Sequence, residues 1–298
     1  MRKFAVLGNL NWDFVLRSIP DWPGWGRELF VDHISRIPGG IAHASLAASR
    51  LGAKVAAVGA VGSDLDGTTL ITHLEQAGVH VEALRSPEAA TGLSTAIVAP
   101  NAERTYFTYA GALATASPLD LWHYFREHAG AYRLLLVSGA PLIKQSSFKD
   151  WVELVTEAHD RRIEIALDLG WDPNEQWDFW RDILPLVDIV IVNEAEENVY
   201  LKPQFTPRVA IVKQGADGAR IIKDSATISI PAFPTTPIDT GGAGDVWNGA
   251  FAFRYLETGD LLQSAAFANA AASLYVSKPA TESRYPHKES VLKLLREA

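Results

Sequence analysis

The seven residues from Asp239 to Asp245, DTGGAGD, open a predicted helix and carry the clearest chemical signal in the chain. Three glycines and one alanine leave a run of backbone N–H groups there uncovered by side chains. The first turn of a helix has N–H groups without intrahelical partners, and the helix dipole adds partial positive charge. These features predict an anion site, which a transferring phosphoryl group needs because charge spreads over its equatorial oxygens.

Asp245 lies in the first turn of that helix, beside the predicted anion site. A carboxylate there can accept the proton of an attacking hydroxyl group and orient that group toward phosphorus. The helix dipole favours the ionised carboxylate and so predicts a weak base, which suffices when proton transfer is late. The alternative is a glycine-rich turn that Asp245 caps without any chemistry.

Short apolar runs alternate with amphipathic stretches along most of the sequence. Predicted strands cover Phe4–Gly8, Val55–Gly59, Leu134–Val137, Ile163–Leu167, Ile189–Val192 and Val209–Val212. Predicted helices cover Ala42–Leu51, Leu65–Ala77, Phe148–His159, Trp177–Leu184, Gly244–Leu256, Leu261–Ser277 and Lys288–Arg296. Continuous Val, Ile and Leu strands separated by helices indicate an α/β fold with a parallel sheet covered on both faces.

Two stretches, Glu28–Ile37 and Ser94–Tyr109, instead alternate polar and apolar positions. This period of two is typical of strands with one face in water. We expect a small antiparallel sheet that projects from the main domain as a lid over a cleft. The alternative is an edge extension of the main sheet.

Composition narrows the function classes. The 298 residues include 27 Lys and Arg against 35 Asp and Glu, a net charge of −8, which argues against a nucleic-acid partner. There is no cysteine, which excludes disulfides, thiolate metal sites and a cysteine nucleophile. No apolar run approaches the ~18 residues of a membrane span, and the N-terminus does not read as a signal peptide. We therefore expect a cytoplasmic protein with no membrane partner.

The segment DTGGAGDVWNG resembles the signature D-T-x-G-A-G-D-x-F-x-G of the ribokinase-like, or PfkB-type, carbohydrate kinases, with Trp247 in place of Phe. Four further stretches match this family in the expected order. They are Gly8–Asp13, the N-terminal signature (Pro38–Gly40, Ala47–Gly52 and Val58–Gly67), the N-x-x-E motif Asn193–Glu196, and the nucleotide loop Lys213–Gly218. The sequence contains neither the P-loop pattern G-x-x-x-x-G-K-[ST] nor the dinucleotide fingerprint G-x-G-x-x-G.

The resemblance implies a Rossmann-like three-layer sandwich with a mostly parallel central sheet and a small β lid. It implies a single kinase domain over residues 1–298, with a lid from about 10–38 and 92–110. The implied reaction is ATP-dependent phosphorylation of a sugar hydroxyl, with ATP and Mg²⁺ as cofactors.

The resemblance also implies individual roles. Asp245 is the catalytic base, and Gly242, Ala243 and Gly244 form the anion hole. ATP is bound by Asn193, Lys213, Gly215, Gly218 and Asn269. The acceptor is bound by Asn11, Asp13, Gly39, Gly40, His43 and Asp245. Glu196 and Asn193 organise Mg²⁺ through water, although the same pair reads equally as a helix cap. Asp239 corresponds to a residue that helps hold a monovalent cation in many members, which makes K⁺ a candidate cofactor.

The sequence departs from the family pattern in three places. Ala44 stands where an Asn is common, so either a substrate hydrogen bond is missing or His43 supplies it; otherwise His43 is simply a packed or solvated residue. Trp12, Trp22 and Trp25 flank the lid. We expect these side chains to pack within the lid in preference to stacking on a ligand. The loop Ser277–Ala280 lacks a common Gly, which argues against the cation site.

The acceptor stays open between two hypotheses. A sugar is favoured, and the resemblance of Asn11 to a residue of ribose-type family members implies a pentose or ribosyl compound. A nucleoside kinase is the alternative, with lid tryptophans stacked on the base. A non-catalytic ligand-binding homologue is disfavoured because the motif residues are retained. We also expect that the exposed lid strands could form the contact of a homodimer.

Overall fold

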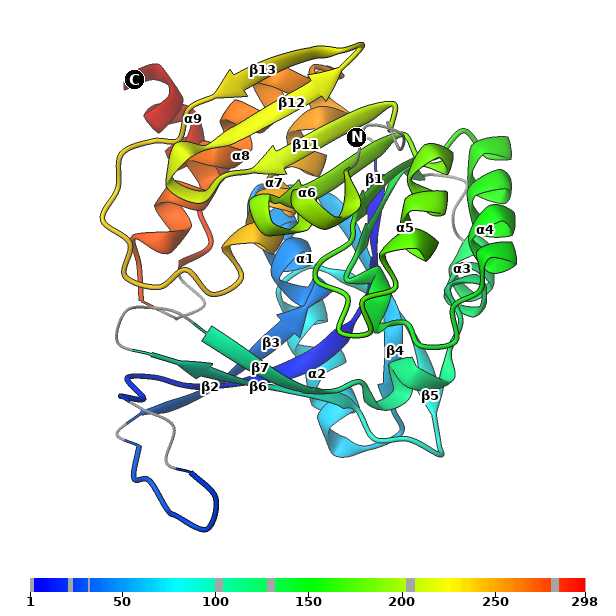
Figure 1. Ribbon diagram of the computed structural model, residues 1–298, viewed down its shortest axis with the longest axis vertical. Coiled ribbons are helices and arrows are strands. Elements are labelled where there is room, and N and C mark those ends of the chain that lie inside the picture. The colour runs from blue at the N-terminus through cyan, green and yellow to red at the C-terminus, as the bar shows by residue number, and fades with distance from the viewer. Residues whose placement is uncertain are drawn as a thin grey trace.

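The computed structural model describes residues 3–20, 24–31, 33–99, 104–127, 132–201, 207–279 and 284–297. Its central sheet has the strand order β13-β12-β11-β10-β9-β8-β1-β4-β5 (Figure 1). These strands are β1 (Lys3–Gly8), β4 (Lys54–Gly62), β5 (His80–Ser86), β8 (Tyr132–Ser138), β9 (Glu164–Asp168), β10 (Ile189–Asn193), β11 (Val209–Lys213), β12 (Ala219–Lys223) and β13 (Ala226–Ile230). Every pairing from β5 to β11 is parallel, whereas β12 and β13 form an antiparallel hairpin at the edge.

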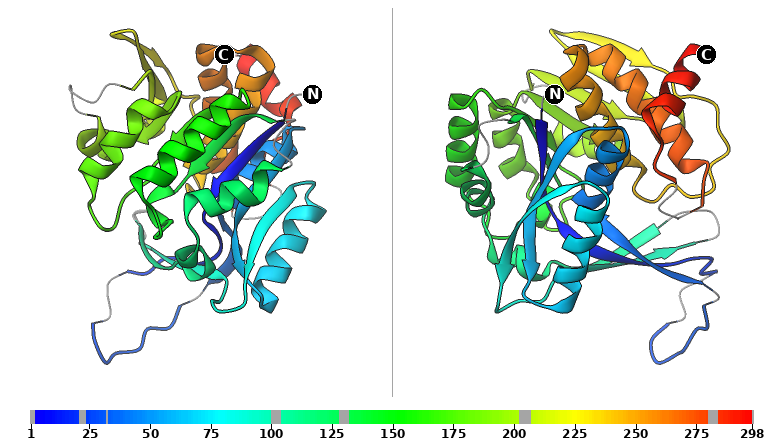
Figure 2. Two further views of the ribbon diagram at one scale, coloured as in Figure 1. Left: turned by 90° about the vertical axis from the view of Figure 1, so that its right-hand side faces the viewer. Right: turned by 180° about the vertical axis from the view of Figure 1, so that it is seen from behind.

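Helices cover both faces of this sheet (Figure 2). They are α1 (Ile41–Arg50), α2 (Leu65–Gln76), α3 (Pro118–Arg126), α4 (Phe148–Asp160), α5 (Trp177–Ile183), α6 (Glu194–Tyr200), α7 (Ala243–Thr258), α8 (Leu261–Val276) and α9 (Lys288–Glu297). Along β1, Phe4 and Val6 enter one core while Ala5 and Leu7 enter the other, as the alternation of strand side chains requires. Among the described residues, no helix has the length and apolarity that a membrane span requires.

The order of the strands reverses at β1. From β1 the chain builds outward through β4 to β5, and it then returns to the other side of β1 with β8 and continues to β11. In open α/β sheets, ligands bind outside the carboxyl ends of the strands at such a switch point. The fold therefore places the expected site where Gly8 and Ser138 end neighbouring strands.

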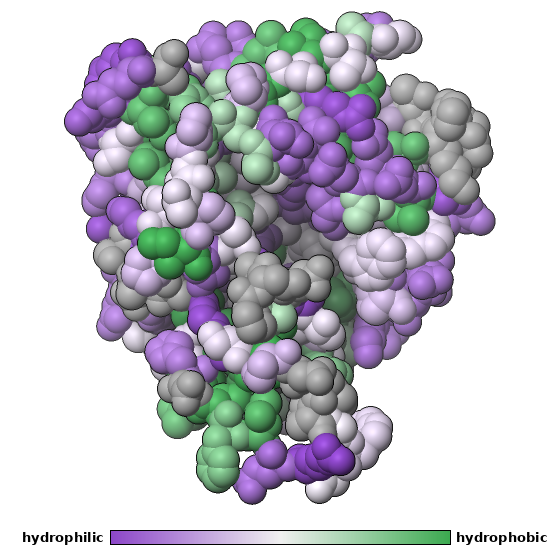
Figure 3. Space-filling model, turned by 60° about the vertical axis from the view of Figure 1, so that its left-hand side comes forward, coloured by the Kyte–Doolittle hydropathy of each residue, from purple (hydrophilic) through white to green (hydrophobic). Residues whose placement is uncertain are grey.

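A second sheet projects from this edge, in the order β3-β2-β6-β7. It comprises β2 (Leu10–Leu16), β3 (Ile34–Gly40), β6 (Gly92–Val98) and β7 (Arg104–Tyr109). The β2–β3 and β6–β7 pairs are antiparallel as predicted, but the central β2–β6 pair is parallel. The strand predicted at 28–37 begins only at Ile34 and continues to Gly40, and residues 28–31 precede it without forming a strand. In Figure 3, hydrophobic residues gather at the lower end of the molecule, where this lid lies.

Helices α1 and α7 pack at very short range. A Cβ atom added to Gly249 would lie only 2.2 Å from the carbonyl oxygen of Ala44, so this position tolerates no side chain. Helix α1 begins directly after the Gly39–Gly40 bend, and α7 begins in the glycine-rich turn. The close packing therefore brings the bend and the turn to the same side of the molecule.

We expect Gly249→Ala to lower the free energy of unfolding, because its methyl group would press against the backbone of α1. Alanine is the better helix former by up to about 1 kcal/mol, so helix propensity alone predicts the opposite sign. Overpacking should dominate, with a net loss of about 1–3 kcal/mol in urea denaturation followed by circular dichroism. Unchanged or higher stability would contradict the close approach of the two helices.

Candidate active site

The floor of the site is built from the last residues of parallel strands. Ser138 ends β8, Asp168 ends β9, Asn193 ends β10 and Lys213 ends β11. Parallel strands bring their carboxyl ends to one edge, so these polar side chains gather there without any continuous sequence motif. The N-terminus of α7 lies beside them, since Lys213 Nζ is 3.4 Å from the place that a Cβ of Gly244 would take.

The glycine-rich turn has the backbone that an anion site requires. Gly242 adopts a left-handed conformation, with φ of 74°, and a side chain on it would meet the His43 ring at 2.9 Å. Ala243 N–H donates to the Thr240 carbonyl at 3.2 Å, so the turn itself uses this predicted anion-hole amide. Within the described residues, the amides of Gly242, Gly244 and Asp245 have no hydrogen-bond acceptor. These three amides are the groups free to bind an anion.

Asp245 stands at the junction of the turn and the strand ends, where Ser138 Oγ donates to Oδ1 at 3.4 Å. Burial and the negative charge of Asp168 raise the pKa of Asp245 to about 7, although Lys213 opposes the shift. The pKa of Asp245 thus lies above its ordinary value, opposite to the direction expected from the helix dipole. A carboxylate with a pKa near 7 is suited to general-base catalysis.

Lys213 belongs to a network that the sequence patterns did not indicate. Its Nζ donates to Asp168 Oδ2 at 3.1 Å and to Asn248 Oδ1 at 3.2 Å, and the Asn248 amide donates to the same Asp168 oxygen. Burial alone would lower the pKa of Lys213, but the charges of Asp168, Glu196 and Asp245 raise it. A fixed ammonium group thus lies next to the uncovered amides.

Asn193 and Glu196 form the helix cap that was one of the two sequence interpretations. Asn193 Oδ1 accepts from the Glu196 amide at 2.9 Å, and Glu196 Oε2 accepts from the Asn193 amide at 2.9 Å. Burial and the charge of Asp168 raise the pKa of Glu196. The carboxylates of Glu196 and Asp168 lie close enough to repel each other, and both offer oxygen atoms as metal ligands. Such a pair suits Mg²⁺ bound through water. The cap and a magnesium role are therefore compatible.

A cavity of about 450 Å³ opens on one side of the turn. Its wall is mostly apolar and includes Phe233, Trp247 and Val276, together with the predicted nucleotide residues Gly215, Gly218 and Asn269. The Asn269 amide donates to the carbonyls of Ile230 and Pro231 at 3.0 Å and accepts from Trp247 Nε1 at 2.7 Å. Asn269 thus holds the cavity wall in place. It also accepts the indole N–H of Trp247, the residue that replaces the Phe of the family pattern.

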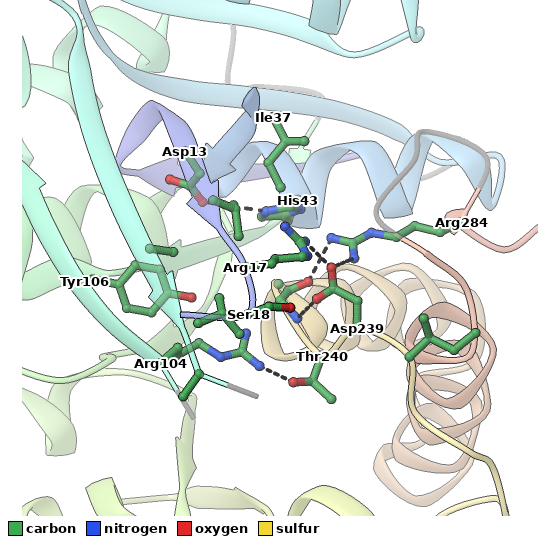
Figure 4. Close-up of a pocket in the computed structure, with 17 residues that line it drawn as sticks. Asp13, Arg17, Ser18, Ile37, His43, Arg104, Tyr106, Asp239, Thr240 and Arg284 are labelled. Carbon is green, nitrogen blue, oxygen red and sulfur yellow. Dashed lines mark hydrogen bonds and ion pairs between the residues drawn. The ribbon is translucent and has the colours of Figure 1, made fainter. Parts of the chain in front are cut away.

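A second cavity, of about 180 Å³, opens between the turn and the lid (Figure 4). Asp13 and His43 line it, with His43 Nε2 3.9 Å from Asp13 Oδ2. Burial raises the pKa of Asp13 to about 6, against a hydrogen bond from Asn11 Nδ2 at 2.7 Å. Asn11 therefore positions Asp13 and does not line the cavity itself. A Cβ on Gly39 would lie 2.2 Å from Asp13 Oδ1, so this glycine makes room for the carboxylate.

His43 is a buried residue and not an exposed helix side chain. Its Nδ1 lies 2.8 Å from the Tyr285 hydroxyl, and burial lowers its pKa to about 3, so the ring is neutral. Its ring packs under Gly242, where it shapes the turn as well as the cavity wall. Gly40, with φ of 57°, lies where a Cβ would be 2.0 Å from the Asn9 carbonyl oxygen, and so permits the bend before α1.

Two arginines contact the carboxylate of Asp239. Arg17 forms an ion pair with Oδ2, and Arg284 Nη1 lies 3.4 Å from the same oxygen. Arg284 Nη2 and the Tyr275 hydroxyl both donate to the Gly241 carbonyl at 2.9 Å. Burial would raise the pKa of Asp239, but these arginines and the Gly241 amide outweigh it and lower the pKa. The oxygens that a monovalent cation would need already bind guanidinium and hydroxyl donors, so the arrangement does not fit K⁺.

Of the lid tryptophans that the structure describes, neither Trp12 nor Trp25 lines either cavity. Trp12 is buried on the far face of β2, where its Nε1 donates to the Asp66 carbonyl at 3.0 Å and Arg36 covers its ring at 4.1 Å. Trp25 is 95% exposed. Trp22, expected beside the lid, and Ala280, in the loop expected to lack a cation-site glycine, lie outside the described residues. Lid packing is thus the role of Trp12.

The family model described as pfkB family carbohydrate kinase matches residues 1–288. The ribokinase of Bacillus subtilis (strain 168) is 30% identical over 306 aligned residues, which cover 99% of this chain and all of that protein. The ATP-dependent ribose-1-phosphate kinase of Halopiger xanaduensis is 26% identical over all of this chain and 99% of that protein. The solved ribokinase of Giardia lamblia superposes with a TM-score of 0.84 at 22% identity, over 99% of each chain. This likeness confirms the predicted three-layer fold with its β lid.

Proposed function

This chain belongs to the pfkB family of carbohydrate kinases, and from that membership we propose that it transfers the γ-phosphoryl group of ATP to a hydroxyl group of a sugar or sugar-like acceptor. The resemblance found in the sequence is confirmed by the match over residues 1–288. One observation supports the reaction most directly. The turn from Thr240 to Gly244 lines both cavities and carries uncovered amides, and Asp245 follows it directly in the first turn of α7.

In the proposed reaction, ATP lies in the larger, mostly apolar cavity, and the acceptor lies under the lid beside Asp13. The amides of Gly242 and Gly244 and the Lys213 ammonium bind the γ-phosphoryl oxygens and stabilise their charge in the transition state. As the acceptor oxygen bonds to phosphorus, the bond from phosphorus to the bridging oxygen breaks and ADP leaves. Asp245 takes the acceptor proton.

We propose Mg²⁺ as the second cofactor, which would neutralise part of the phosphate charge when bound with ATP. Glu196 and Asn193 would hold it through water. The raised pKa of Glu196, caused by burial and by the nearby Asp168 charge, is consistent with a site in which negative charge exceeds the single positive charge of Lys213.

The acceptor is proposed to be a pentose or another small sugar in preference to a nucleoside. The cavity of about 180 Å³ is small, and Trp12, on which base stacking depended in part, faces away from it. One relative is named for ribose and another for ribose 1-phosphate, so the family relationship alone leaves the acceptor charge open.

Residues 1–298 are proposed to form one kinase domain with the lid at about 10–38 and 92–110. A homodimer through the lid is proposed on the exposure of apolar side chains there, which include Phe30 at 90%, Ile34 at 55% and Tyr109 at 56%. A cytoplasmic location stays a prediction from the sequence.

Asp245→Asn is expected to lower kcat by roughly 10²–10⁴-fold, because the amide cannot accept the acceptor proton. ATP affinity, measured by calorimetry, should change little, since the uncovered amides and Lys213 are retained. Asp182→Asn, at an exposed carboxylate on α5, is the matched control. Unchanged turnover in the Asp245 variant would remove that residue from the mechanism.

The pH profile of kcat/KM should show an acidic limb near pH 7, because burial and Asp168 raise the pKa of Asp245 to about 7 and only the ionised form is a base. Activity is therefore lost as the pH falls through this value. Ser138→Ala removes a hydrogen bond that favours the ionised carboxylate, so the limb should move to higher pH. A limb that stays in place or moves to lower pH would contradict this assignment.

Turnover is expected to be independent of K⁺, because Arg284 already contacts Asp239 and the Gly241 carbonyl behind the anion turn. The measurement is the initial rate of ADP formation in K⁺, Na⁺ and tetramethylammonium chloride at equal ionic strength. Rates within about twofold are expected, since the nearby positive charge is covalently fixed. Strong activation by K⁺ alone would show that a cation site exists despite the arginine.

A further inference from the structure

The cavity under the lid has a gradient of charge along β2. Side chains alternate between the two faces of a strand, so Asp13, Val15 and the following Arg17 point to the same side, and all three line the cavity. Asp13 lies near the Gly39–Gly40 bend, whereas Arg17 reaches Asp239 before the anion turn. At a strand rise of about 3.3 Å per residue, the two positions are roughly 13 Å apart along the backbone.

Positive charge is in excess at the Arg17 end. Arg17, Arg104 and Arg284 all line the cavity there, and Figure 4 shows them around Asp239 and Thr240. Asp239 is shared between Arg17 and Arg284, and Arg104 donates to the neutral hydroxyl of Thr240. Among the described residues that line this end, three guanidinium groups therefore face one carboxylate.

The other groups nearby do not restore the balance. Burial lowers the pKa of His43 to about 3, so this ring adds no charge, and Tyr106 is a neutral phenol beside Arg104. Asp13 lies four residues along β2 from Arg17, and its charge and that of Asp245 both act on Tyr106, so the carboxylates lie toward the other end of the cavity without being remote from Arg104. Arg284 is only 3% exposed, and its Nη1 finds no hydrogen-bond acceptor among the described residues. Asp239, the Gly241 carbonyl and the Tyr275 ring are nevertheless partners of Arg284. The positive charge left for a ligand is therefore that of Arg104, which meets only a neutral hydroxyl, and of Arg17, which shares Asp239 with Arg284.

We propose that the physiological acceptor is an anionic sugar, a sugar acid or a sugar phosphate, whose carboxylate or phosphate is bound by Arg17 and Arg104 while its reacting hydroxyl lies between Asp13 and Asp245. This proposal rests on the kinase function proposed above. Planar guanidinium groups bind carboxylate and phosphate oxygens in pairs, which fixes orientation as well as charge. A neutral sugar would leave the arginine end of the cavity without its counter-charge.

The same arginines also join the lid to the anion turn, so a purely structural role must be separated from recognition. If Arg104 only held the lid closed over Thr240, its loss would lower turnover of neutral and anionic acceptors by the same factor. If it binds the anionic group, its loss lowers kcat/KM for the anionic acceptor selectively, mainly through KM. The ratio between matched acceptors therefore distinguishes the two roles.

The test is Mg²⁺- and ATP-dependent ADP formation with two matched pairs, ribose against ribose 1-phosphate and glucose against gluconate. The anionic member of at least one pair should have the higher kcat/KM, by roughly 10-fold or more, because charge-assisted hydrogen bonds are strong. The two pairs separate a phosphate preference from a carboxylate preference. Arg104→Gln should reduce the preference roughly 10- to 100-fold, and Arg104→Lys should retain part of it.

Arg50→Gln, at an exposed arginine at the end of α1, is the matched control and should leave the preference unchanged. Thermal unfolding of each variant reports whether it folds, and Arg104→Lys supplies the readout if Arg104→Gln does not. A preference for both neutral sugars, or an equal loss with both members of a pair, would overturn the anionic acceptor while the kinase function stands. ADP formation with none of the four acceptors would count against both.

Discussion

The structure depends on holding the first turn of α7 uncovered between two cavities. This turn brings unpaired amides to the place where two cavities adjoin. The turn is held from three sides: Gly249 lets α7 approach α1, the His43 ring packs under Gly242, and Arg284 binds the Gly241 carbonyl. Because each contact constrains backbone and not a mobile side chain, the amides are oriented before any ligand arrives.

Electrostatics at the strand ends follow from the same geometry. Asp168, Glu196 and Asp245 gather within reach of one ammonium group, that of Lys213. Burial and the negative charge of Asp168 raise the pKa values of both Glu196 and Asp245. One arrangement thus produces both an acidic surplus suited to a divalent cation and a base with a pKa near neutrality. The sheet thereby brings together polar groups that belong to separate local motifs.

Sequence patterns predicted what is local. The strand and helix alternation, the turn before α7 and the Asn193–Glu196 pair are each contained in a few residues, and the structure has them at nearly the expected bounds. The short β12 and β13 strands gave no clear signal. The contact of Arg17 with Asp239 joins residues near opposite ends of the chain, and Arg284 contacts the same carboxylate across helices α7 and α8, so no local spacing could indicate either. The raised pKa of Asp245 is caused first by burial, a tertiary property that a local pattern does not indicate.

Two arginine side chains connect the lid to the anion turn. Arg17 reaches from the end of β2 to Asp239, whose other oxygen accepts the Gly241 amide, and Arg104 reaches from β7 to Thr240. Movement of the lid away from the body would break both contacts and release the flank of the turn. Closure and amide orientation therefore stabilise each other, as linked equilibria must. An acceptor that bridges lid and turn strengthens this closed state, whereas water makes no such bridge, which favours transfer to the acceptor over hydrolysis of ATP.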